Sequence, residues 1–163
     1  MLAAPSSSRP KNIRQLGVRL KHSANRAVAG GKRIVLIDDS IVRGTTSVKI
    51  VQMMREAGAS EVHFRIASPP ITHSDYYGID TPERDKLLAA THDLEGMRQF
   101  IGADSLAFLS VAGIYRAMGY PQRDPVRPQF TDHCFTGDYP TALTDLSATD
   151  SSPRQLSLLA EAS

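Results

Sequence analysis

Residues 34–47, with the sequence IVLIDDSIVRGTTS, decide the fold. The stretch opens with four apolar β-formers that no polar residue interrupts. Such a run predicts a strand of a parallel sheet covered on both faces. Asp38 and Asp39 follow at once, and the Thr/Ser cluster after them is typical of a helix start. We therefore expect a strand, an acidic tip, a loop and a helix, with the loop at the ligand-binding edge of an α/β sheet.

The loop between the expected strand and helix has the composition of a phosphate site. Gly44 lets the backbone approach an anion closely. The backbone N–H groups of residues 42–46 can surround a phosphate, and the hydroxyls of Thr45 and Thr46 can add hydrogen bonds. The sequence therefore predicts a phosphate cradle.

The two carboxylates before the loop narrow the choice of ligand. Asp38 and Asp39 can accept hydrogen bonds from neighbouring sugar hydroxyls or coordinate Mg²⁺. Two acids next to a phosphate would repel it unless hydroxyls or a metal lay between them. A sugar phosphate therefore fits this stretch better than a bare phosphate does.

The stretch closely resembles the 5-phosphoribosyl-1-pyrophosphate (PRPP) motif of type I phosphoribosyltransferases, in the variant of the amidophosphoribosyltransferase family. The resemblance covers residues 13–146 and concerns the carboxy-terminal part of that family. Seven further segments carry it: residues 14–18, 23–26, 55–59, 68–71, 77–80, 101–104 and 135–139. An acidic pair and a Gly-Thr-Thr loop would be moderately specific alone, but this ordered series is highly specific.

The resemblance implies an α/β fold, with a parallel sheet flanked by helices, and a pentosyltransferase. The family transfers the phosphoribosyl group of PRPP to ammonia, giving 5-phosphoribosylamine in the first step of de novo purine biosynthesis. By resemblance, Asp38 and Asp39 hold the ribose hydroxyls and help to place Mg²⁺. The residues implied to bind PRPP are Asp38, Asp39, Ser40, Val42, Arg43, Gly44, Thr45 and Thr46. No catalytic residue is assigned.

The sequence departs from the family pattern in two ways. Position 2 is Leu2 and no cysteine precedes Cys134, so we expect the glutaminase domain to be absent. The strands and the pyrophosphate loop that should precede residue 13 are also missing, which predicts an incomplete sheet on the amino-terminal side. One hypothesis is an enzyme that relies on a separate chain or is part of a longer one. The alternative is a non-catalytic module that binds PRPP or nucleotides, or an inactive fragment of the enzyme.

Metal sites other than that of Mg²⁺ are not expected. Some family members carry an iron-sulfur cluster held by several cysteines, but Cys134 is the single cysteine of this sequence, so no such cluster is expected. The pair His133 and Cys134 lacks the second pair of ligands that a zinc site requires.

The formal net charge of +2 hides a basic arm. Residues 1–37 hold eight Lys or Arg and no Asp or Glu. The arm has no aromatic residues on which bases could stack, so we expect no nucleic-acid partner. A transit peptide fits the composition, although family-like sequence begins at residue 13. We favour attraction of a polyanionic substrate, because the resemblance implies that this segment belongs to a mobile loop that closes over PRPP. Arg19, Lys21 and Arg26 are the candidate contacts, while a solvated face stays open.

The 163 residues, 41% of them hydrophobic, suit one domain. We expect a disordered leader at 1–12, a partial phosphoribosyltransferase domain at 13–120, an extended wrap at 121–146 and a disordered tail at 147–163.

No apolar run could span a bilayer, and a lone cysteine fits a reducing compartment, so we expect no membrane partner and a cytoplasmic location. A homo-oligomer remains open.

Periodicity predicts the elements after the loop. Helices are expected at 46–57, 82–90, 94–101 and 111–118, and strands at 61–67 and 105–109. In the first of these strands, Val62, Phe64 and Ile66 share a face. Strand, helix and strand predict a parallel βαβ crossover. The loop at 68–81 carries His73, a candidate phosphate contact or acid-base group that is more often incidental.

Overall fold

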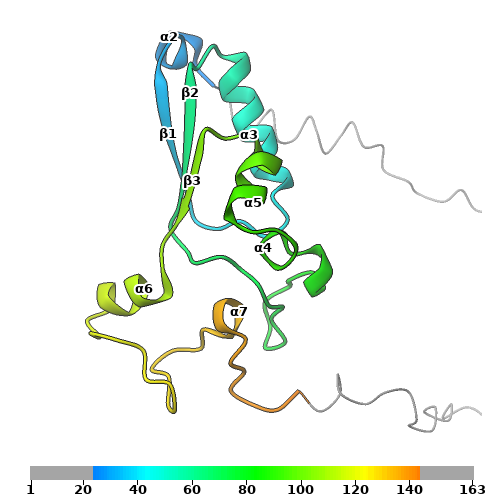
Figure 1. Ribbon diagram of the computed structural model, residues 1–163, viewed down its shortest axis with the longest axis vertical. Helices are drawn as coiled ribbons and strands as arrows, with labels where there is room; N and C mark the ends of the chain where they lie inside the picture. Colours follow the sequence, from blue (N-terminus) through cyan, green and yellow to red (C-terminus); the bar gives the residue numbers. More distant parts are fainter. Residues whose placement is uncertain (1–23, 144–163) are drawn as a thin grey trace, which may run out of the picture.

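The computed structural model describes residues 24–143, which form a parallel three-stranded sheet with the strand order β1-β2-β3. Helices flank the sheet (Figure 1). Within residues 24–143, no helix has the length and hydropathy needed to cross a membrane. In chain order the elements are α2 (Arg26–Ala29), β1 (Arg33–Asp38), α3 (Thr45–Glu56), β2 (Glu61–Ile66), η1 (Arg84–Lys86), α4 (Leu88–Thr91), α5 (Leu94–Ile101), β3 (Ser105–Phe108), α6 (Val111–Ala117) and α7 (His133–Thr136).

The predicted parallel βαβ unit is confirmed. Strand β1 pairs with β2 in parallel along its full length, from Arg33 opposite Glu61 to Asp38 opposite Ile66. Helix α3 connects the two strands. Strand β3 adds to the other edge of β2, also in parallel. The carboxyl ends of all three strands therefore meet at one edge of the sheet, where the loop after Asp38 begins.

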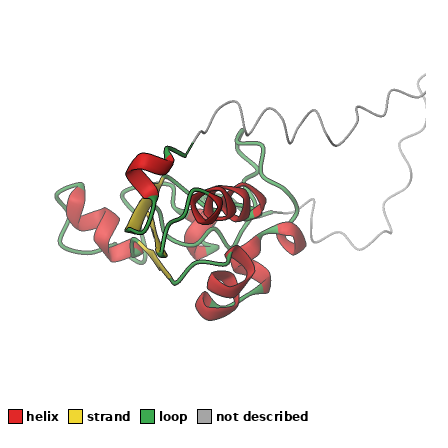
Figure 2. Cartoon of the chain, turned by 90° about the horizontal axis from the view of Figure 1, so that it is seen from above, coloured by secondary structure: helices red, strands yellow, loops and turns green. Residues whose placement is uncertain are grey.

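The core lies between one face of the sheet and the helices α3 and α5. As predicted, the side chains of Val62, Phe64 and Ile66 alternate onto one buried face of β2. Figures 1 and 2 show α3 and α5 on the same side of the strands. The buried side chains that these helices contribute to the core are Val51, Met97 and Ile101.

The prediction that the first strand is covered on both faces is wrong for the described residues. Ile34 and Leu36 pack against the core, but Val35 is 60% exposed and Ile37 is 79% exposed. Strand β1 is an edge strand, and within residues 24–143 no helix covers its second face. The continuous apolar run therefore predicted the strand correctly, but it wrongly predicted that both faces of the strand are buried.

The predicted helix at 82–90 is also wrong. The structure has the short 3₁₀ turn η1 and the single helical turn α4 instead. The backbone is extended at Glu83 and again at Leu87, which interrupts any continuous helix. Thr81, directly before this segment, does not cap a helix, because its hydroxyl oxygen accepts a hydrogen bond from the Asp75 N–H at 2.6 Å.

Residues 120–143, which we call the C-terminal strap, form bends and the helical turn α7 and contain no strand, whereas the sequence predicted an extended wrap at 121–146. A buried carboxylate anchors the strap. The Arg123 Nε donates to Asp132 Oδ2 at 2.6 Å, and the Tyr115 hydroxyl of α6 donates to the same oxygen at 2.9 Å. The predicted leader (1–12) and tail (147–163) lie outside the described residues.

Asp104 joins the end of α3 to the start of β2. Its Oδ2 accepts hydrogen bonds from the Val62 N–H at 2.5 Å and from Arg55 at 2.6 Å. These donors, the Val62 N–H first, lower the pKa of Asp104 below its ordinary value of 3.8. The contribution of this carboxylate to stability is therefore complete above about pH 5 and is lost as the pH falls through about 4 towards the lower folded value.

We expect Asp104→Asn to reduce the free energy of unfolding at pH 7 by about 1 kcal/mol, since a charged hydrogen-bond acceptor is lost. The variant should also lose less stability than the wild type between pH 5 and about pH 3, because one depressed carboxyl no longer titrates. Urea titrations at several pH values measure both effects. Asp80→Asn, at an exposed position, is the control. Equal acid sensitivity of wild type and Asp104→Asn would contradict this interpretation.

Candidate functional site

The carboxyl end of β1 presents two acidic side chains. The Ala67 N–H donates to the Asp38 carbonyl at 2.9 Å, which fixes the tip of β1 to the end of β2. Asp38 Oδ1 accepts from the N–H of Asp39 at 3.1 Å, and Asp39 Oδ1 accepts from the Ser40 hydroxyl at 3.3 Å. Asp38 is half-buried and Asp39 is exposed, so both carboxylates can reach a ligand outside the sheet.

The loop that follows is closely packed from behind. The Ile41 side chain is buried in the core, and the Val42 carbonyl accepts from the Leu88 N–H at 2.9 Å. Gly44 has a φ of +72°. A Cβ atom there would come within 2.7 Å of Leu88 Cδ2 and 3.1 Å of Phe100 Cε1. Glycine is therefore required at this position for both its conformation and its size.

The opposite side of the loop offers unused hydrogen-bond donors. In the part of the chain that the structure describes, the backbone N–H groups of residues 42–47 have no acceptor. Thr45 and Thr46, the first residues of α3, are exposed. Helix α3 is 12 residues long, so its dipole places partial positive charge at this end. Free N–H groups, hydroxyls and a helix N-terminus together can bind an anion such as a phosphate.

The donor set also fits a hard cation beside that anion. Asp38 and Asp39 offer carboxylate oxygens, the ligands that Mg²⁺ prefers. Their charges oppose a phosphate in direct contact, whereas a sugar or a divalent cation between them would remove the conflict.

The structure brings the residues predicted from the motif into one continuous tip and loop. Ser40 and Val42 are half-buried, Gly44 is buried, and Arg43 is exposed. It does not bring Arg26 to them: Arg26 lies in α2, beside the start of β1 and at the opposite end of that strand from Asp38 (Figure 1). Arg19 and Lys21 lie outside the described residues.

His73 is placed against the C-terminal strap. It shares a hydrogen bond of 2.9 Å with the Thr72 hydroxyl, and its ring meets that of Tyr139 edge-on. A Cβ at Gly137 would come within 2.6 Å of His73 Nε2. Burial lowers the pKa of His73, and the Arg84 guanidinium lowers it further. Both effects favour the neutral ring, which does not suit electrostatic attraction of a phosphate.

Sequence reasoning missed the two side chains behind the loop. Leu88 of α4 and Phe100 of α5 follow Gly44 by more than 40 residues, and nothing in the local pattern links them to it. The glycine itself was the available signal, because a required glycine indicates a close neighbour or a positive φ.

Comparisons with known proteins give one consistent set of relatives, although no family model matches the chain. The chain is 65% identical over 151 residues to the amidophosphoribosyltransferase of Rhizobium etli, covering 92% of this chain and 30% of the relative. It is 54% identical over 131 residues to the Bacillus subtilis enzyme of the same name, covering 80% of this chain and 27% of that enzyme.

Solved structures agree in fold. The glutamine PRPP amidotransferase of B. subtilis, solved in complex with ADP and GMP, superposes with a TM-score of 0.70 at 51% identity, over 86% of this chain and 30% of that one. A structure described as the allosteric regulatory enzyme of purine biosynthesis has a TM-score of 0.65 at 47% identity. The chain spans about 30% of the length of these relatives.

Proposed function

Because the chain belongs to the amidophosphoribosyltransferase family, as the counterpart of part of the carboxy-terminal phosphoribosyltransferase domain, we propose that it binds PRPP at the tip of β1 and the loop after it. The observation that carries the proposal is the row of unpaired N–H groups at residues 42–47 beside two carboxylates. A phosphorylated sugar satisfies both parts of this site, since its phosphate accepts hydrogen bonds from the N–H groups and its hydroxyls donate to the carboxylates.

Each predicted residue then has a role. The N–H groups of residues 42–46 and the hydroxyls of Thr45 and Thr46 hold the 5-phosphate. The carboxylates of Asp38 and Asp39 orient the ribose through its hydroxyls and hold Mg²⁺. Ser40 and Arg43 belong to the same loop and line the ligand. Bound Mg²⁺ would stabilise the negative charge of the departing pyrophosphate.

The reaction proposed for the complete system is transfer of the phosphoribosyl group from PRPP to ammonia, which yields 5-phosphoribosylamine and pyrophosphate. This is the first step of purine biosynthesis, which we place in the cytoplasm. The contribution of this chain is positioning, because binding the 5-phosphate and the ribose hydroxyls holds C1 in place for attack by ammonia. Residues that deliver ammonia are supplied by segments beyond those described or by a second chain. The exposed apolar side chains of Val35 and Ile37 support such a partner at the open face of β1.

A second candidate function is a module that binds PRPP or nucleotides without catalysis. It requires only the binding groups that the tip of β1 and the loop after it supply, namely two carboxylates and the free N–H groups of residues 42–47. Release of pyrophosphate from PRPP that depends on ammonia and on this chain alone would exclude the second candidate. Binding without release would support it.

Isothermal titration calorimetry of the full chain with PRPP and Mg²⁺ tests the proposal. We expect saturable binding, and we expect Asp38→Asn with Asp39→Asn to weaken it more than about tenfold, since two charged acceptors are lost. The same double variant should bind inorganic phosphate at least as well as the wild type, because two repelling charges are gone. Asp80→Asn, at an exposed site, should leave PRPP binding unchanged. Equal weakening for PRPP and phosphate, or no PRPP binding, would overturn the proposal.

A further inference from the structure

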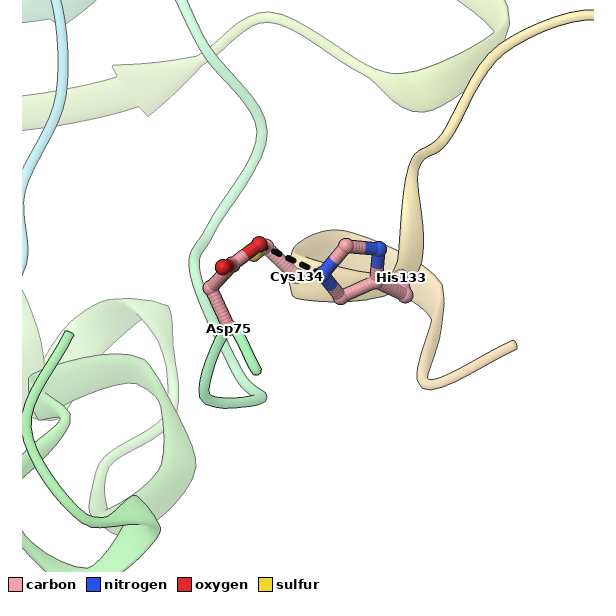
Figure 3. A group of neighbouring side chains, drawn as sticks. All are labelled: Asp75, His133 and Cys134. Carbon is pink, nitrogen blue, oxygen red and sulfur yellow. Dashed lines mark hydrogen bonds and ion pairs between the residues drawn. The ribbon is translucent and has the colours of Figure 1, made fainter. Parts of the chain in front are cut away.

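A second group of ligand-type side chains lies at the contact between the C-terminal strap and the loop at 67–83. Asp75 of the loop meets His133 and Cys134 of α7 (Figure 3). The Asp75 Oδ2 lies 2.8 Å from His133 Nε2 and 3.9 Å from Cys134 Sγ. One ligand atom from each residue falls within 4.8 Å of the other two. None of these residues belongs to the site at the end of β1.

The three side chains converge in a largely water-free place. The side chains of His133 and Asp75 are 5% and 4% exposed, and Cys134 is half-buried. The rings of Tyr77 and Tyr139 pack against the His133 ring, with centroids 5.0 and 5.1 Å away. Burial of a carboxylate, an imidazole and a thiol together is costly unless their polar atoms are satisfied by one another or by a bound ion.

The backbone holds the group in position. The N–H groups of Tyr77 and Ile79 both donate to Asp75 Oδ1, at 2.8 and 2.9 Å, which leaves Oδ2 directed at His133 and Cys134. The Cys134 carbonyl accepts from the N–H groups of Thr72 and His73, at 2.9 and 3.1 Å. Hydrogen bonds that orient a ligand from behind in this way are typical of metal sites.

We propose that Asp75, His133 and Cys134 form a binding site for one Zn²⁺ ion, with water as the fourth ligand, which fastens the C-terminal strap to the loop at 67–83. Zinc accepts oxygen, nitrogen and sulfur ligands in tetrahedral geometry. Zinc–ligand distances of about 2.0–2.3 Å place tetrahedral ligand atoms roughly 3.3–3.7 Å apart. The Asp75–His133 and Asp75–Cys134 separations of 2.8 and 3.9 Å lie on either side of this range. All three ligand atoms lie within 4.8 Å of one another, so shifts of about 1 Å would bring them to zinc-binding distances.

Charge and sequence both bear on the assignment. A carboxylate, a thiolate and a neutral imidazole balance the two positive charges of Zn²⁺, so that the buried site is neutral overall. Binding displaces the proton of the Cys134 thiol, and that proton leaves to solvent. The sequence alone predicted no zinc site at His133 and Cys134, since the third ligand is 58 residues away from His133.

The His133 Nδ1 bears on the expected affinity. This atom is buried and has no hydrogen-bond partner within the described residues. Many zinc-bound histidines donate their second ring N–H to a carboxylate or carbonyl, and loss of that partner weakens binding by about 10- to 100-fold. We therefore expect affinity below that of structural zinc sites with a complete outer shell.

Metal titration of the full chain tests the site. After treatment with a chelator, the wild type should bind one equivalent of Zn²⁺, and Co²⁺ in its place should give the absorption band of a thiolate bound to cobalt. This spectrum needs no variant, so it remains informative if a substitution prevents folding. Zn²⁺ should also raise the Tm of the wild type.

Variants locate the ligands. Cys134→Ser should abolish the cobalt–thiolate band, and Asp75→Asn and His133→Gln should each weaken Zn²⁺ binding at least about tenfold. His92→Gln, at an exposed histidine, is the matched control and should bind as the wild type does. The proposal is overturned if the wild type shows no cobalt–thiolate band, or if Cys134→Ser binds Zn²⁺ as tightly as the wild type. The group would then be a hydrogen-bonded contact alone.

Discussion

Gly44→Ala should reduce the free energy of unfolding by about 2–5 kcal/mol and abolish PRPP binding. The left-handed conformation costs a side chain about 1–2 kcal/mol, and forcing a methyl group into close packing costs about 1–3 kcal/mol more. The new Cβ would meet Leu88, which is 4% exposed and packed within the core cluster. Phe100 is 45% exposed and can swing outwards, so Leu88 decides the outcome. Urea denaturation and calorimetry measure the two losses.

Gly102→Ala separates the two causes. Gly102 has a φ of +77°, close to that of Gly44, but nothing lies within 4 Å of the Cβ position. This control should lose only the conformational part, about 1–2 kcal/mol, and should keep PRPP binding. If both substitutions cost the same, the packing of the loop against α4 and α5 does not restrict it as described.

Arg123→Met should reduce the free energy of unfolding by about 3–5 kcal/mol, because it leaves a buried carboxylate without its cation. The Asp132 side chain is 7% exposed, and Arg123 donates to both of its oxygens. Methionine keeps most of the volume and removes the charge. The Tyr115 hydroxyl, at 2.9 Å, and the Thr136 hydroxyl, at 3.1 Å, would remain as partners of Asp132.

Two comparisons make this result specific. Arg116→Met removes an exposed arginine from α6 and should change stability by no more than about 0.5 kcal/mol. Adding Asp132→Asn to Arg123→Met should recover part of the loss, because no unpaired buried charge remains. An unfolding free energy for Arg123→Met within 1 kcal/mol of the wild type would show that this ion pair does not hold the strap.

Local signals in the sequence were sufficient for most of the helices and strands. The Asp93 side chain accepts from the Gly96 N–H at 2.7 Å, and the helix α5 after it was predicted at its observed bounds. The Ser110 side chain caps α6 in the same way. Alternation in β2 was enough to identify its buried face. In each case the deciding interaction lies within a few residues along the chain.

The errors came where distant contacts decide the structure. The Thr81 hydroxyl could cap a helix, but it accepts a hydrogen bond from the Asp75 N–H instead. The helix expected at 82–90 does not form. Turn α7 is held by Asp75 and Arg123, which local pattern cannot bring to it. The uninterrupted run in β1 carries no alternation, so it could not reveal that one face is exposed.

In the candidate site, too, the neighbouring residues could be predicted from the sequence and the distant contacts could not. The sequence motif predicted which residues share the tip and loop, since they are contiguous. It could not predict that Leu88 and Phe100 support Gly44 from behind, or that Asp75 meets His133 and Cys134 across 58 residues. Contacts of this kind depend on how the whole sheet and the strap are packed.

Amide NMR of the full chain during titration with PRPP and Mg²⁺ shows whether the loop after β1 holds the phosphate of PRPP. We expect the largest shifts at the free N–H groups of residues 42–47, and we expect these shifts to saturate together with the calorimetric signal. Binding of PRPP that leaves those six amides unshifted and moves amides elsewhere would contradict this expectation.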